Sequence, residues 1–145
     1  PSGAPAEFGD FELAANALGV CDAACECAMS YAKKERRAGK PLYDHQLVQL
    51  KLNEMHMLTE ALRSFVLRTA WEMDNRIQGV NPILVMNHSQ ATVQRVTELN
   101  MPIHGADAAS MDATANKLVR DAIIWTHLAG DNAQRLKLFR RLRTH

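Results

Sequence analysis

The sequence predicts an all-α protein, a long up-and-down four-helix bundle followed by a short fifth helix. Apolar residues recur at three- and four-residue steps over long segments, and the alternation typical of strands is almost absent. Glycine or proline follows each segment where a helix would end. The chain has 145 residues, 47% apolar and 23% charged, which suits one globular domain with a sizeable core.

The first two helices are expected to be the longest. The first is predicted over residues 10–38, with Gly39 as its C-cap and Pro41 preventing its continuation. The second is predicted from Asp44, as N-cap, to Ile77. Residues 1–9 are assigned to a linker or disordered segment, and residues 10–145 to the bundle. The expected facing core residues are Leu13, Ala17, Cys21 and Ala28 with Leu52, Met55, Leu62 and Val66, and Leu47, Leu58 and Phe65 widen the second stripe.

The remaining helices are predicted from their caps and breakers. The pair Asn81-Pro82 opens a third helix, which is expected to end near Pro102 and to be followed by a loop over residues 104–107. Asp112 is the expected cap of a fourth helix, which Gly130 ends. A fifth helix is predicted over residues 132–143. The expected inward residues of the fourth helix are Leu118, Ala122, Trp125 and Leu128.

Composition excludes several classes of function. Seventeen basic and sixteen acidic side chains create no global field that would attract nucleic acid. No apolar run reaches the roughly 18 residues that a membrane span needs. Three cysteines within seven residues form no disulfide framework and are typical of a reducing compartment, so a cytoplasmic location is expected.

Metal-binding patterns are also absent from the sequence. A di-iron bundle needs Glu-x-x-His, and no glutamate here precedes a histidine by three residues. Cys21 and Cys25 share a helix face from which Cys27 is rotated, so all three are interpreted as small buried side chains. A basic tail leaves open a remote alternative, a nucleic-acid-binding bundle; it contains Arg135, Lys137, Arg140, Arg141 and Arg143.

Residues 19–55, GVCDAACECAMSYAKKERRAGKPLYDHQLVQLKLNEM, resemble a run typical of the acyl-CoA dehydrogenase family. The family pattern there includes Tyr-Ala, Arg-x-x-Phe-Gly-x-Pro-Leu, Gln and Lys-Leu-Ala-x-Met. Further matches follow at Arg120-Asp121-Ala122 and in the closing segment. The resemblance implies the C-terminal helical domain of these FAD-dependent enzymes, which oxidise acyl-CoA at a CH–CH bond. It also implies association with a homologous subunit.

The resemblance further implies that the usual catalytic residue is missing. In many members the Glu of a Glu-Gly-Thr motif takes the α proton, and here that position is Ala129, which can do no proton chemistry. Other members place the base near the start of the first helix of this domain. The aligned position is Gly9, and Glu12, about one turn away, is the substitute candidate.

Positions implied to contact FAD are partly replaced. The family's Arg near the flavin pyrophosphate corresponds to Glu35, its Thr corresponds to Asp131, and its Gln-x-x-Gly-Gly loop corresponds to residues 102–106. Negative charge at two of these positions predicts weak or absent FAD binding by this chain alone. The cofactor-binding candidates that remain are Arg36, Gly39, Gln46, Gly105 and Gly130.

Two interpretations of function follow from the resemblance. In the first, the chain is a catalytically silent or structural half-site that pairs with an active subunit. In the second, it is the C-terminal domain of an active acyl-CoA dehydrogenase with a relocated base. Both require acyl-CoA and flavin contacts from the family's other domains, which these 145 residues do not contain.

Overall fold

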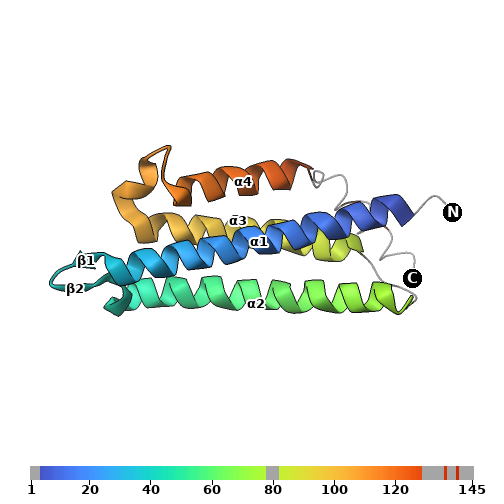
Figure 1. The fold of residues 1–145 in the computed structure, drawn as a ribbon, viewed down its shortest axis with the longest axis horizontal. Helices are drawn as coiled ribbons and strands as arrows, with labels where there is room; N and C mark the ends of the chain where they lie inside the picture. The colour runs from blue at the N-terminus through green and yellow to red at the C-terminus, as the bar shows by residue number, and fades with distance from the viewer. Residues whose placement is uncertain (1–3, 78–81, 129–135, 137–139, 141–145) are drawn as a thin grey trace.

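The computed structural model describes residues 4–77 and 82–128, together with Leu136 and Arg140. Four helices run back and forth along one long axis, and a small hairpin joins the first two (Figure 1). The elements are α1 (Ala4–Lys34), β1 (Arg36–Arg37), β2 (Lys40–Pro41), the 3-10 helix η1 (Leu42–Asp44), α2 (Gln46–Asp74), α3 (Pro82–His104), the 3-10 helix η2 (Gly105–Ala109) and α4 (Thr114–Leu128).

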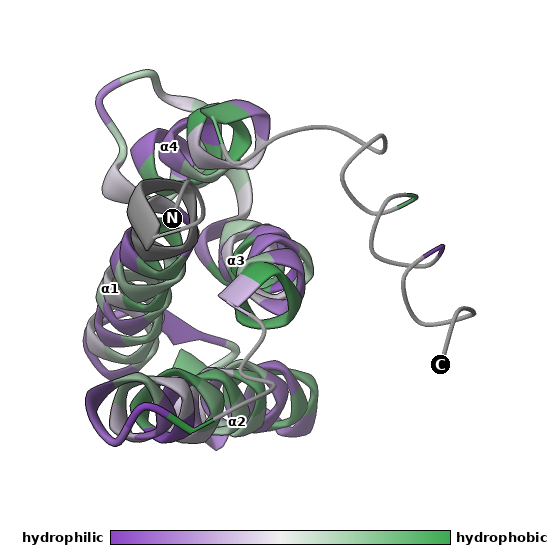
Figure 2. Ribbon diagram, turned by 90° about the vertical axis from the view of Figure 1, so that its right-hand side faces the viewer, coloured by the Kyte–Doolittle hydropathy of each residue, from purple (hydrophilic) through white to green (hydrophobic). Residues whose placement is uncertain are grey.

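Helix α3 packs against each of the other three helices, and most extensively against α1. Seen end-on, it lies beside α1, with α4 on one side and α2 on the other (Figure 2), and its buried residues come from more than one face. It contains buried polar side chains that bond its own backbone, such as Thr97 Oγ1, which donates to Val93 O at 2.8 Å. The predicted all-α bundle is confirmed. The predicted fifth helix lies outside the described residues, apart from Leu136 and Arg140.

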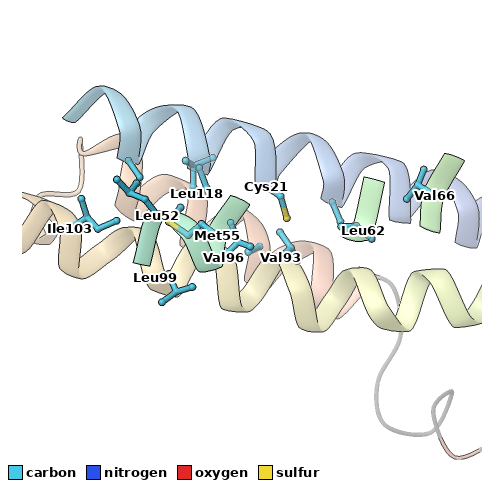
Figure 3. Packing of buried hydrophobic residues seen from close by; sticks show 14 of the residues in the cluster. Cys21, Leu52, Met55, Leu62, Val66, Val93, Val96, Leu99, Ile103 and Leu118 are labelled. Atoms are coloured by element: carbon cyan, nitrogen blue, oxygen red, sulfur yellow. The ribbon is translucent and has the colours of Figure 1, made fainter. Parts of the chain in front are cut away.

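A stripe of small side chains on α1 lets the helices approach closely. Figure 3 shows Cys21 of α1 turned inward near Val93 and Val96 of α3. Of the eight predicted facing residues, Leu13 is half-buried and the other seven are buried. The stripe consists of Ala14, Ala17, Cys21, Ala24, Ala28 and Ala32, each at most 3% exposed.

The predicted boundaries of the first helix were wrong at both ends. Helix α1 begins at Ala4, so residues 4–9 are helical where a linker was expected. Alanine favours helix strongly, and Pro5 is tolerated in a first turn. The helix ends at Lys34 because the chain then forms a hairpin. Gly39 is therefore a turn residue and not a helix cap.

The other boundaries also moved by a few residues. Asp44 lies in η1, and α2 begins after His45, which makes no capping bond through its side chain. Helix α2 ends at Asp74, three residues before the predicted end. Pro102 lies inside α3, since a proline in the last turn removes only one helical bond. Asp112 precedes α4 without capping it, and its own N–H donates to Ser110 Oγ at 3.3 Å.

Two residues predicted to face the core are exposed. Leu47 of α2 is 73% exposed and Leu128 of α4 is 64% exposed. The periodic pattern places them at the margins of their stripes, where none of the described helices covers them. Among the described residues, no helix is long and apolar enough to cross a membrane.

Candidate functional site

The turn between α1 and α2 has a backbone geometry that strongly favours glycine. Residues 36–37 pair with residues 40–41, and both turn residues have positive φ, 49° at Ala38 and 82° at Gly39. Two consecutive positive φ values define a tight two-residue hairpin turn, which glycine adopts without steric cost. We call residues 35–45 together with Gly105 the hairpin corner.

Hydrogen bonds hold the hairpin corner in one conformation. Leu42 N donates to Glu35 O at 2.8 Å, and Arg36 Nη2 donates to Gly39 O at 2.8 Å across the turn. His45 Nε2 donates to Arg37 O at 3.0 Å, because a carbonyl oxygen can only accept. These bonds tie the hairpin to the start of α2.

Gly105 brings η2 against the hairpin. Its φ is +58°, and a Cβ placed on it would lie 3.3 Å from Arg37 Nη2. The hairpin and η2 therefore meet at one end of the bundle, although Arg37 and Gly105 are 68 positions apart in the sequence (Figure 1). A side chain at residue 105 would displace the guanidinium.

The hairpin corner and the end of α1 carry a local excess of positive charge. The cationic side chains are Lys33, Lys34, Arg36, Arg37 and Lys40, and all are exposed. Glu35 and Asp44 oppose them. Such a patch suits a phosphate-bearing group, which arginine binds through charge-assisted hydrogen bonds. Glu35 weakens this fit without reversing the sign of the patch.

Tyr31 fixes η2 relative to α1. Its hydroxyl donates to Asp107 Oδ2 at 2.5 Å and lies 3.2 Å from His104 O. The hydrogen bond to Asp107 and burial raise the pKa of Tyr31 to about 12, so it remains protonated at neutral pH. Tyr31 thereby positions η2, including Gly105, beside the hairpin.

The structure brings together three of the predicted cofactor-binding residues. Arg36 and Gly39 lie in the hairpin, and Gly105 lies against Arg37. Gln46 is the exposed first residue of α2, next to His45. Gly130, like Ala129 and Asp131, lies outside the described residues.

Glu12 does not join the hairpin corner. It is exposed on α1, about 33 Å along the helix axis from Lys34 at 1.5 Å per residue. Within residues 4–77 and 82–128, no group of three or more His, Cys, Asp or Glu side chains could hold a metal ion. Of the three cysteines, Cys21 is buried while Cys25 and Cys27 are half-buried, so the prediction of three buried thiols holds fully only for Cys21.

Sequence reasoning missed Arg37. The resemblance points to Arg36 because it adjoins Glu35, yet the Arg36 guanidinium donates to Gly39 O within the turn. The signal that could have found Arg37 is the Ala38-Gly39 pair flanked by two short polar segments, which is typical of a tight hairpin. The sequence predicts a helix through residue 38, and side chains on a helix point in other directions than side chains on a hairpin. The helix prediction therefore gave the wrong direction for Arg37.

These features define a class of protein: an antiparallel helical bundle with a basic hairpin corner between its first two helices. Residues 7–142 match the family described as acyl-CoA dehydrogenase, C-terminal domain. The chain therefore belongs to the acyl-CoA dehydrogenase family. The match covers nearly all of the described bundle.

Individual relatives agree with this assignment. A probable acyl-CoA dehydrogenase of Bacillus subtilis is 29% identical over 136 residues, which cover 92% of this chain and 36% of that protein. The short-chain specific acyl-CoA dehydrogenase of Megasphaera elsdenii is 30% identical over 129 residues, covering 88% and 34%. Butyryl-CoA dehydrogenase from Megasphaera elsdenii superposes with a TM-score of 0.89 at 27% identity, covering 96% of this chain and 37% of that one. The chain thus spans about a third of the length of these relatives.

Proposed function

We propose that this chain serves as the C-terminal helical domain of an acyl-CoA dehydrogenase-like flavoprotein and forms a catalytically silent half-site. The observation that carries the proposal is the replacement of the usual glutamate by Ala129 in a chain that matches the family model over residues 7–142. Without a carboxylate there, no group at that position can take a proton from an acyl thioester. The role that remains is to pair with an active homologous subunit and to shape its site.

The residues of the hairpin corner support weaker FAD binding than is usual in the family. Arg37 and Lys40 suit a pyrophosphate, whereas Glu35 places a carboxylate where the family has arginine. A charge-assisted hydrogen bond contributes about 1.5–3 kcal/mol, so the lost arginine weakens FAD binding by roughly 10- to 150-fold. We propose that the chain alone binds FAD weakly or not at all.

An active dehydrogenase with Glu12 as a relocated base remains the alternative. The exposed position of Glu12 leaves its carboxylate free to face a neighbouring domain or subunit. The remote nucleic-acid alternative gains no support, since the family match and the structural relatives point to acyl-CoA dehydrogenases.

A domain exchange tests the proposal. Residues 7–142 would replace the equivalent domain of the Megasphaera elsdenii butyryl-CoA dehydrogenase, whose fold they share. We expect the chimera to fold, to retain little flavin and to oxidise butyryl-CoA more than about 100-fold more slowly, because the base is missing. Adding Ala129→Glu, Glu35→Arg and Asp131→Thr should restore flavin and activity together. Flavin absorbance and dye reduction measure the two quantities.

The opposite results separate the alternatives. An unmodified chimera that is yellow and active would refute the silent half-site. If Glu12→Gln then abolished its activity without loss of flavin, the relocated base would be supported. Within the restored chimera, Arg37→Glu should lower flavin content, and Lys51→Glu, which lies outside the hairpin corner, is the matched control.

A second feature supports a partner subunit. Three residues of α2, Leu50, Met57 and Trp71, lie seven and fourteen residues apart on the side opposite the buried face, with Ser64 at the intervening position. They are 59%, 58% and 59% exposed, respectively. Helix α2 is therefore apolar on two sides, and the described helices of this chain cover only one of them. We propose that this stripe, which we call the outer α2 stripe, contacts a second subunit.

Charge in the outer α2 stripe is expected to prevent association. Wild-type protein should sediment as a dimer or larger species at micromolar concentration, and Met57→Glu should sediment as a monomer with unchanged helicity. Met111→Glu is the matched control, since Met111 is 67% exposed and lies between η2 and α4. A monomeric wild type at high concentration, or an associated Met57→Glu protein, would contradict the proposed contact.

A further inference from the structure

A groove beside α1, α3 and η2 contains a thiol and an imidazole in contact. The groove has a volume of about 600 Å³, and Cys27 and His104 are among the side chains that line it. Cys27 Sγ lies 3.5 Å from His104 Nε2. The pair lies outside the hairpin corner, and the proposed function makes no use of it.

The surroundings of His104 settle which ring nitrogen carries the proton. Its Nδ1 lies 3.1 Å from Asn100 O, and since a carbonyl oxygen only accepts, Nδ1 must donate. In the neutral ring Nε2 is then unprotonated and accepts the proton of the Cys27 thiol. The Tyr31 ring packs on His104 with centroids 4.1 Å apart, so the imidazole is held in this orientation.

The two other cysteines lack this arrangement. Cys21 is completely buried, and burial raises the pKa of its thiol to about 12. Burial also raises the pKa of Cys25, whose Sγ lies 3.4 Å from Thr59 Oγ1. Cys27 alone among the three combines an open groove with an adjacent base, and this is the arrangement that activates cysteine nucleophiles.

We infer that Cys27 and His104 form a nucleophilic site that binds α,β-unsaturated carbonyl compounds covalently. His104 Nε2 takes the thiol proton, and Sγ bonds to the β carbon as the carbon–carbon double bond opens. The α carbon then takes a proton from the imidazolium, which returns His104 to its neutral form. All atoms of both reactants remain in the adduct, and neither an oxidant nor a leaving group is needed.

The groove matches this class of electrophile. Ala23 of α1 and Ala113 give its lining an apolar part, the carboxylates Glu26 and Asp107 also line it, and Ser30 and Lys34 offer hydrogen-bond donors for a carbonyl oxygen. A thiolate is a soft nucleophile that adds readily to a polarised double bond. The inference does not depend on the proposed acyl-CoA role, because it concerns a different set of residues.

Competitive labelling with N-ethylmaleimide tests the inference. The folded 145-residue chain would receive less than one equivalent, and the modified cysteine would be identified by peptide mass spectrometry. We expect Cys27 to react roughly tenfold or more faster than Cys25 in the folded protein. In denaturant the two should react at similar rates, because unfolding separates Cys27 from His104.

A histidine variant distinguishes chemical activation from simple access. His104→Gln should slow the labelling of Cys27 by roughly tenfold or more, while His88→Gln, at an exposed histidine of the same helix, should leave it unchanged. Equal rates at Cys25 and Cys27 in the folded wild type would overturn the inference. So would a folded His104→Gln protein that labels as fast as wild type. If that variant fails to fold, the ratio of the two rates in wild type decides.

Discussion

Leu62→Ala is expected to lower the free energy of unfolding by about 3 kcal/mol, within the roughly 2–5 kcal/mol typical of such truncations. Leu62 is completely buried in the core that α2 shares with α1 and α3. Truncation removes apolar contacts and leaves a cavity that rigid helices fill only partly. A loss of this size is a large fraction of the roughly 5–15 kcal/mol that stabilises a typical domain.

Leu67 provides a matched control on the same helix. It is 61% exposed, so Leu67→Ala should change the free energy of unfolding by less than about 0.5 kcal/mol. Urea unfolding followed by circular dichroism, at one fixed protein concentration, measures both variants. Similar losses for the two would show that α2 does not bury the face assigned to the core.

Ala24→Leu is expected to destabilise the bundle by about 1–3 kcal/mol although it adds apolar surface. Ala24 is completely buried in the small-residue stripe of α1, and α1 makes its most extensive contacts with α3. A larger side chain there must push the two helices apart or adopt a strained rotamer.

The matched control is Ala15→Leu, at an exposed position of α1. Because leucine and alanine both favour helix, this variant should be within about 0.5 kcal/mol of wild type. Urea unfolding again provides the measurement. An Ala24→Leu protein that is as stable as Ala15→Leu would mean that α1 and α3 are not closely packed along this stripe.

The hairpin between α1 and α2 shows that apolar periodicity alone does not predict where a helix ends. The periodic signal of α1 continues through Ala38, since Tyr31 and Ala32 fit the stripe and Lys, Glu and Arg favour helix. The chain leaves the helix at Lys34 because Leu42 is buried in the core and the hairpin bonds connect Glu35 to Leu42. Tertiary burial therefore outweighed local helix propensity, and the helix ends four residues before its predicted end at Ala38.

The candidate site likewise contains residues that the sequence predicts and residues that only the structure identifies. Arg36, Gly39 and Gly105 could be selected from the resemblance, because they occupy positions of a recognisable motif. Arg37 could not, because its approach to Gly105 depends on a positive φ and on two segments distant in sequence. The contact between Cys27 and His104 could not be predicted from the sequence either. Helical periodicity shows which cysteines share a face of one helix, but it does not show which residues of other helices pack against that face.

The sequence by itself determined the helical class, the inward faces of the long helices and the membership of the family. These properties depend on the spacing of apolar residues and on ordered motifs, both of which are local in the chain. Only the tertiary structure decided where α1 stops, which arginine meets Gly105 and which thiol meets an imidazole. Those outcomes depend on contacts between residues far apart in the sequence. The free energies of such contacts are as large as local conformational preferences, so the contacts can outweigh those preferences.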